Sequence, residues 1–171
     1  MNASAITKPM RVDNVELAVR PITLGDVDRL YDLFGRLSPE SVHSRFFSPI
    51  RRPPKIFMLR LAAVDHVRRD ALVALDGDQI VAVARYDAPA GAVDAEIALT
   101  VADDWQHHGI GLRLAGRLAC LAASRGYENF TATMLSDNRA ALGLVRKLSP
   151  DATVRFAGGG YEATMPLPRA S

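Results

Sequence analysis

The stretch "TVADDWQHHGIGLRLAG", residues 100–116, runs from an alternating strand pattern through Trp105 and two histidines into two closely spaced glycines and a helix. The apolar spacing predicts that this helix begins at Gly111 and continues to about Arg125, with Gly126 as the residue that ends it. The first N–H groups of a helix have no partner within the helix, and together with the helix dipole they attract anions. The stretch therefore predicts an anion site between a strand and a helix.

Two common phosphate-binding motifs do not fit this site. A dinucleotide fingerprint requires Gly-x-Gly-x-x-Gly, but Gly109 and Gly111 are followed by Gly116, which is out of register. A Walker loop requires Gly-Lys-Ser or Gly-Lys-Thr, and the sequence contains neither. Arg113 and Arg117 lie in the first two turns of the helix, where a cation is disfavoured unless an anion is bound. They either supply charge to a bound polyphosphate or form a solvated face.

Length and composition indicate one domain and exclude several function classes. With 171 residues, 49% of them apolar, the chain can bury one core but is short for two ordinary domains. The 21 basic and 19 acidic side chains give no broad basic field, so we expect no nucleic-acid partner. The apolar run at residues 71–84 is interrupted at residues 76–79, so we expect no membrane span. Cys120 is the only cysteine and residues 1–10 lack a secretory signal, which favours the cytoplasm.

Periodicity along the chain predicts a loose tail at residues 1–14 and one domain over residues 15–171. Strands are predicted at residues 15–22, 71–75, 79–86, 93–101 and 129–135 and in a hairpin at 153–167, with helices near 27–34, 39–47, 55–63, 111–125 and 138–148. Thr23 and Asp26 are expected to form a capping box, Ser38 to cap the second helix, and Ser136 or Asp137 to cap the last. This order favours an α+β or mixed α/β fold over a doubly wound one.

The segment Gln106-His107-His108-Gly109-Ile110-Gly111 resembles the Gln/Arg-x-x-Gly-x-Gly/Ala signature of the GNAT superfamily of acyl-CoA-dependent N-acyltransferases. The similarity extends from "LAVRPITLGDVDRLYDLF" at residues 17–34 to "SDNRAALGLVRKL" at residues 136–148. Within the superfamily, "LSPESVHSRFF" and "DAEIALTVADDWQHHGIGLRL" are most similar to bacterial protein lysine acetyltransferases of the Pat type. The resemblance implies a GNAT-like α/β (α+β) domain. Its sheet would be mixed, mostly antiparallel, of about seven strands, splayed in the middle and flanked by about four to five helices.

The resemblance also implies that acetyl-CoA lies in the gap beside the strand at residues 93–101. Its pantetheine arm would pair with the backbone there, its pyrophosphate would rest on N–H groups at residues 108–112, and Gln106 would shape the loop. Arg113 would offer charge, and Asn138 would contact the pantetheine or adenosine end. The residues implied for coenzyme A are Leu99, Val101, Gln106, His108, Gly109, Ile110, Gly111, Leu112, Arg113 and Asn138.

Glu96 is the expected general base. An alkylammonium has no lone pair, and a lysine-type amine with a pKa of about 10.4 is almost fully protonated at neutral pH, so a base must be near. Glu96 lies in the middle of its strand, at the position of the glutamate base in Pat-type sequences. It is alternatively a solvated side chain paired with Arg85, and Asp94 is the less favoured substitute base. Val145 stands where many GNAT enzymes carry a tyrosine acid, so the thiolate would leave unaided or take a proton from Ser136 or water.

Other features are less informative. The four histidines lack the i, i+4 spacing of zinc enzymes, so no metal is expected. Arg45 and the "RRPP" run mark either an interaction surface or solvated groups. Two functions of different class remain: an N-acetyltransferase acting on a protein lysine or a small-molecule amine, and a non-catalytic acyl-CoA sensor. The sequence identifies neither the acceptor nor the oligomeric state, for which we keep a homodimer as a candidate.

Overall fold

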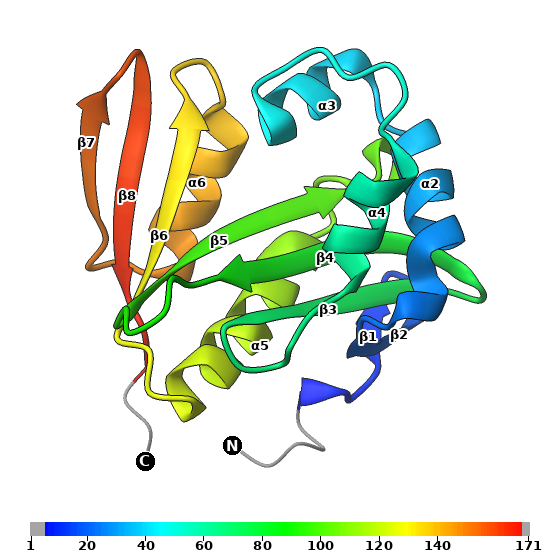
Figure 1. The fold of residues 1–171 in the computed structure, drawn as a ribbon, viewed down its shortest axis with the longest axis horizontal. Helices are drawn as coiled ribbons and strands as arrows, with labels where there is room; N and C mark the ends of the chain where they lie inside the picture. Colours follow the sequence, from blue (N-terminus) through cyan, green and yellow to red (C-terminus); the bar gives the residue numbers. More distant parts are fainter. Residues whose placement is uncertain (1–5, 169–171) are drawn as a thin grey trace.

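An eight-stranded sheet runs through the computed structural model, which describes residues 6–168 (Figure 1). The strands are β1 (Met10–Val12), β2 (Val15–Pro21), β3 (Arg69–Asp76), β4 (Gln79–Asp87), β5 (Asp94–Val101), β6 (Asn129–Leu135), β7 (Thr153–Ala157) and β8 (Gly160–Pro166). The helices are α2 (Val27–Gly35), α3 (Pro39–Phe46), α4 (Lys55–Ala62), α5 (Ile110–Ser124) and α6 (Arg139–Leu148), with 3-10 turns η1 (Leu24–Asp26) and η2 (Asp103–Trp105). In residues 6–168 no helix is long and apolar enough to span a membrane.

The strand order is β1-β2-β3-β4-β5-β6-β8-β7, and every neighbouring pair is antiparallel except β5 and β6. β5 and β6 pair in register only from Asp94↔Asn129 to Glu96↔Thr131. Beyond those residues the two strands diverge, with α3 above the open end (Figure 1). The expected mixed, mostly antiparallel sheet with a central splay is confirmed, with one strand more than the seven expected.

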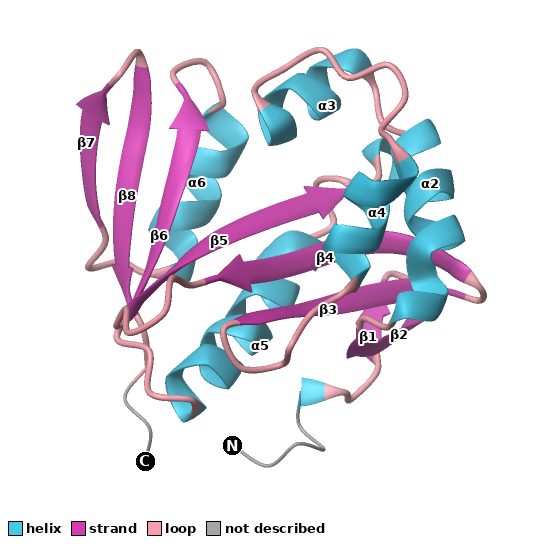
Figure 2. Ribbon diagram, viewed as in Figure 1, coloured by secondary structure: helices cyan, strands magenta, loops and turns pink. Residues whose placement is uncertain are grey.

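Helices cover both faces of the sheet, and this explains why β3 and β4 bury nearly all of their side chains (Figure 2). On one face Leu114 and Leu118 of α5 belong to the same core cluster as Tyr86. On the other face Leu30 of α2 and Met58 of α4 belong to a second cluster. The strands at the centre are therefore continuous apolar runs and hold the edge of β5 rigidly beside the splay.

The additional strand is β1, which lies inside the expected loose tail. It pairs antiparallel with β2 through Met10↔Leu17, and the Met10 and Val12 side chains are buried. The prediction of a loose tail is thus wrong for Met10–Val12, because a strand this short offers no periodicity to detect. Residues 1–5 of that tail lie outside the described residues.

The N-terminal cap of α3 is the predicted residue, and that of α6 is not. Ser38 caps α3 as predicted, since its Oγ accepts a hydrogen bond of 3.2 Å from Ser41 N. The cap of α6 is Asn138 and not Ser136 or Asp137, because Asn138 Oδ1 accepts from Ala141 N at 3.0 Å. Asn138 therefore has a structural role at the mouth of the splay.

Candidate active site

A large groove opens where β5 and β6 separate, bounded by α3, α5 and α6. It contains about 2170 Å³ of open space, including its mouth. Most of the residues expected at the site line it: Glu96, Leu99, Val101, Gln106, Gly109, Ile110, Gly111, Leu112 and Asn138. The fold thus brings together one strand edge, one helix start and the Asn138 cap.

The loop before α5 adopts an unusual backbone conformation. His107 and Gly109 both have positive φ, 65° and 75°, which turns the chain sharply before the helix begins. A Cβ on Gly111 would lie 2.7 Å from Leu99 Cδ2 and 3.3 Å from Leu144 Cδ1, so the start of α5 packs directly on the edge of β5. The first-turn N–H groups, which have no acceptor within the helix, consequently lie at the wall of the groove.

The edge of β5 is also oriented for pairing. Ala102 N donates to Val81 O on the β4 side, and successive strand residues direct their N–H groups to opposite sides. The N–H groups of Leu99 and Val101 therefore point away from β4, into the splay. β6 has already diverged at these residues, so it does not supply their partners.

Gln106 and Asp103 connect this loop to the start of α3. Gln106 Nε2 donates to Asp103 Oδ1 at 2.9 Å, Val101 O at 3.2 Å and Ser41 Oγ at 3.2 Å. The Asp103 carboxylate also accepts from Ser38 N at 2.5 Å and from Ser41 Oγ. Sequence reasoning missed Asp103 and Ser41. The only signals were the acidic pair Asp103-Asp104 after the strand and a serine in the first turn of the helix that Ser38 caps.

Two of the expected residues do not line the groove. His108 Nδ1 pairs with Asp13 Oδ2 at 2.9 Å, and Arg113 Nη1 donates to Arg11 O at 2.5 Å. A different cation, Arg139, lines the groove from the first turn of α6. Arg139 is likewise a cation in the first turn of a helix, where a bound anion would stabilise it.

Glu96 is exposed and lines the groove. Within residues 6–168 it forms no ion pair, and the expected alternative partner Arg85 instead donates from Nη1 to Leu61 O at 3.1 Å. Asp94, the substitute base, accepts from Asn129 Nδ2 at 2.8 Å and does not line the groove. Val145 does line it and is buried, whereas Ser136 does not.

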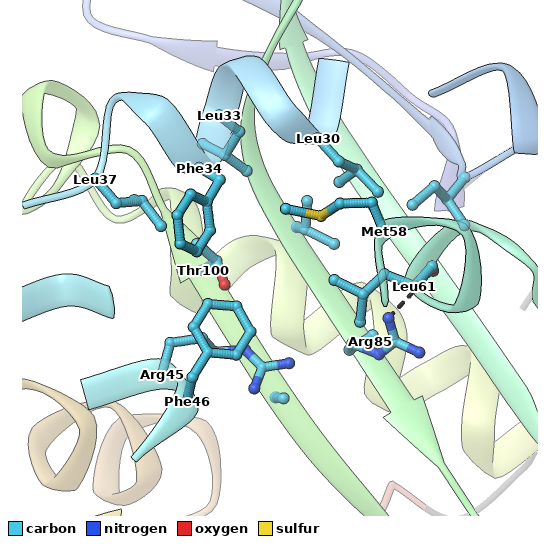
Figure 3. Close-up of a pocket in the computed structure, with 13 residues that line it drawn as sticks. Leu30, Leu33, Phe34, Leu37, Arg45, Phe46, Met58, Leu61, Arg85 and Thr100 are labelled. Atoms are coloured by element: carbon cyan, nitrogen blue, oxygen red, sulfur yellow. Dashed lines mark hydrogen bonds between the residues drawn. The ribbon is translucent and has the colours of Figure 1, made fainter. Parts of the chain in front are cut away.

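A smaller apolar pocket adjoins the groove on the face of β5 that carries Glu96 (Figure 3). The guanidinium groups of Arg45, from α3, and Arg85, from β4, both lie at this pocket. Burial and repulsion from Arg85 lower the pKa of Arg45 to about 10, while attraction from Glu96 opposes the shift. Arg45 is therefore charged at neutral pH and close enough to Glu96 to interact with it.

Comparison with known proteins agrees with this geometry. The family model described as the acetyltransferase (GNAT) family matches residues 28–149. The chain belongs to the GNAT family. This GNAT chain is 34% identical over 133 residues to the acetyltransferase Pat of Mycolicibacterium smegmatis, covering 76% of the chain and 40% of that protein. It is 31% identical over 149 residues to an acetyltransferase of Pseudomonas aeruginosa, covering 81% of the chain and 80% of the relative.

Solved structures show the same GNAT fold. The GNAT domain of S. lividans PAT superposes with a TM-score of 0.89 at 29% identity, covering 98% of this chain and all of that one. A cAMP-binding acyltransferase from Mycobacterium smegmatis gives a TM-score of 0.66 at 28% identity, covering 96% of this chain and 49% of its own. The present GNAT chain thus spans less than half of each of the two Mycobacterium/Mycolicibacterium smegmatis proteins.

Proposed function

We propose that this GNAT domain transfers an acetyl group from acetyl-CoA to a primary amine, on a protein lysine or a small molecule, by direct attack in a ternary complex. The observation that carries this proposal is the groove at the splay of β5 and β6. It places the unpaired edge of β5, the first turn of α5 and the Glu96 carboxylate along one wall. The strand edge can bind an extended amide chain, the helix start can bind an anion, and the carboxylate can act as a base.

The groove suits acetyl-CoA as the donor substrate, which supplies a thioester-linked acetyl group when bound. The N–H groups of Leu99 and Val101 can pair with the amides of the pantetheine arm as a further strand would. The first turn of α5 can receive the pyrophosphate, since Gly109 and Gly111 keep side chains away from it. Arg139 adds positive charge at the groove.

Glu96 would remove a proton from the incoming ammonium, directly or through a water, so that the nitrogen gains a lone pair. The nitrogen then bonds to the thioester carbon to give a tetrahedral intermediate. As the carbon–sulfur bond breaks, the nitrogen loses a second proton, to water or to the departing thiolate, and the neutral amide is left. Whichever of the Leu99 and Val101 N–H groups the pantetheine arm leaves unpaired would stabilise the oxyanion at the splay. Val145 offers no proton, so we propose that the thiolate leaves unaided or takes a proton from water, as a thiol pKa of about 8.5 allows.

Replacing Glu96 by Gln tests the proposal. We expect the dissociation constant of acetyl-CoA, measured by calorimetry, to change less than about twofold, because glutamine keeps the size of the side chain. The kcat of thiol release with an amine panel should fall about 10²- to 10⁴-fold, the range for a lost general base. Activity of the variant should recover partly as pH rises, since more of the amine is then neutral.

Two results would contradict the proposal. Unchanged kcat in Glu96→Gln would remove Glu96 as the base. Tight acetyl-CoA binding without acetylation of any peptide or small amine would favour a non-catalytic acyl-CoA sensor.

A further inference from the structure

We propose that the acceptor is a small primary amine with an apolar body and a carboxylate, and that Arg45, assisted by Arg85, binds this carboxylate in the apolar pocket beside Glu96. The inference deepens the proposed function and rests on it for the identity of the reacting amine. It names the class of acceptor, which neither the family nor the relatives determine for this chain.

The pocket is placed to present an acceptor to the groove. Its enclosed space is small, about 40 Å³, and it shares Arg45, Ala98 and Thr100 with the acetyl-CoA groove. A molecule in it therefore lies against the same segment of β5 that would hold the thioester. Its walls come from α2, α3, α4, β4 and β5 and are otherwise mostly aliphatic or aromatic, as Figure 3 shows. A space of this size can hold the carboxylate group, and the rest of a small acceptor would then extend into the adjoining groove.

Strand register places the charged groups on one face. Arg85 lies directly opposite Ala98, and Asp87 lies directly opposite Glu96. Arg85 and Glu96 are thus diagonal neighbours, a separation of about 7–8 Å between Cα atoms. Ala98 between them is small, which leaves room above the sheet for a ligand.

The two guanidinium groups lack carboxylate partners. Within residues 6–168 neither Arg45 nor Arg85 forms an ion pair. Arg45 lies over the Phe46 ring, 4.9 Å from its centroid, and Arg85 donates to the Leu61 carbonyl. A half-buried cation held without an anion is costly unless a ligand supplies one.

The acidic groups nearby act on the two guanidinium groups only from beyond ion-pair distance. Burial lowers the pKa of Arg85, with attraction from Asp87 and repulsion from Arg69 acting in opposite directions. Glu96 attracts Arg45, and Arg69 is itself paired with Asp65 at 3.9 Å. A carboxylate on the acceptor could contact Arg45 directly and would fit a guanidinium in bidentate geometry. Its ammonium would be drawn to Glu96, and its apolar body would contact partly exposed side chains such as Phe34 and Phe46.

Equilibrium binding tests this inference independently of catalysis. The protein is saturated with coenzyme A, and calorimetry measures the dissociation constants of ω-amino acids of increasing length and of their carboxamides, whose amines have similar pKa values. We expect at least one ω-amino acid to bind about tenfold or more tightly than its carboxamide, as one charge-assisted hydrogen bond warrants. Arg45→Gln should weaken binding of that acid about 10- to 100-fold and leave the carboxamide unchanged.

Two further variants serve as controls. Arg45→Lys keeps the charge but loses the planar guanidinium group, so its affinity for the ω-amino acid should lie between those of the wild type and Arg45→Gln. Arg60→Gln makes the same charge change on the exposed side of neighbouring α4 and should bind the acid as the wild type does. An unchanged unfolding midpoint and unchanged far-ultraviolet circular dichroism show that Arg45→Gln is folded.

Each outcome decides the inference. Equal binding of acids and carboxamides, or no effect of Arg45→Gln, overturns it while the proposed function stands. Preferential binding of a lysine peptide over every small acid also overturns it. If the acids bind selectively through Arg45 but are never acetylated, the anion site holds and the proposed function fails.

Discussion

At the scale of single residues, Gly109 and Gly111 are both glycine for different physical reasons. Gly109 has a φ of 75° with open space around its Cα, so only its backbone conformation requires glycine. Gly111 has ordinary helical geometry, but the side chain of Leu99 occupies the space that a Cβ would need. The two positions therefore respond differently to alanine.

Gly109→Ala should lower the free energy of unfolding by about 1 kcal/mol through left-handed strain, and weaken acetyl-CoA binding only moderately. Gly111→Ala should keep nearly the wild-type stability, because the Leu99 side chain can rotate away from the new methyl group. The rotated side chain lines the groove, however, so the dissociation constant of acetyl-CoA should rise more than it does in Gly109→Ala. Chemical denaturation and calorimetry measure the two effects. The opposite ranking in both assays would show that the groove does not depend on the contact between Leu99 and Gly111.

Arg113 and Arg117 are cations in the first two turns of α5, at the end of the helix dipole that disfavours positive charge. Arg117 Nη1 donates to Ile6 O at 3.2 Å and also to Lys8 O, and Arg113 donates to Arg11 O. Carbonyl oxygens of the N-terminal segment, rather than a phosphate, accept their hydrogen bonds in this structure.

At the scale of elements, the start of α3 and the loop before α5 behave as one unit because Asp103 accepts hydrogen bonds from both. Helix α3 also carries Arg45. The acetyl-CoA wall and the acceptor pocket are thus connected through the Asp103 carboxylate and through the direct hydrogen bond from Gln106 to Ser41.

Asp103→Ala should weaken acetyl-CoA binding about tenfold, since it removes a charge-assisted contact that positions Gln106. Asp104→Ala is the matched control, because Asp104 is the exposed neighbour in the same turn. Calorimetry with acetyl-CoA compares the two variants. Equal affinities would show that the loop keeps its shape without α3.

The turn η1 holds a buried carboxylate that gives stability a defined pH dependence. Asp26 accepts from Arg20 Nη1 and Nη2, both at 2.7 Å, and from Thr23 N at 2.9 Å. The hydrogen bonds from Arg20 outweigh the effect of burial and lower the pKa of Asp26 to about 2. A lowered pKa contributes stability above the unfolded-state value of about 3.9, and this stability is lost as pH falls through the folded value.

Asp26→Asn should therefore be less stable than the wild type by about 2 kcal/mol at pH 6, and the difference should shrink as pH falls from about 4 to 2. Urea unfolding at stepped pH measures it. The exposed Asp65, whose pKa is also lowered to about 2 by backbone hydrogen bonds, is present in both proteins and cancels in the difference. A difference that does not depend on pH would exclude the Arg20–Asp26 pair as its source.

At the scale of the whole molecule, the sheet is two antiparallel blocks joined by a short parallel contact. The β5–β6 pairing is confined to one end, and β8 and β7 continue beyond β6. A ligand that bridges the splay would connect the two blocks along their open length.

Saturating acetyl-CoA should consequently stabilise the fold, by about 2.7 kcal/mol at one hundred times its dissociation constant. Hydrogen exchange should slow at Leu99 and Val101 and in the first turn of α5, and Glu96→Gln should show the same protection. Protection confined to other elements would place the ligand elsewhere.

The sequence by itself determined the order of strands and helices other than β1, the splayed GNAT fold and the residues at the mouth of α5, because these depend on local periodicity and on one contiguous motif. Gln106, Gly109 and Gly111 belong to that motif and Glu96 to the strand before it, and all four line the groove. Only the tertiary structure decided that β1 is ordered, that Arg113 and His108 lie outside the groove, and that Asp103 and Arg45 lie beside it. Those outcomes depend on contacts between segments far apart in the chain, and no local pattern encodes which distant carbonyl, carboxylate or cavity a long polar side chain will reach.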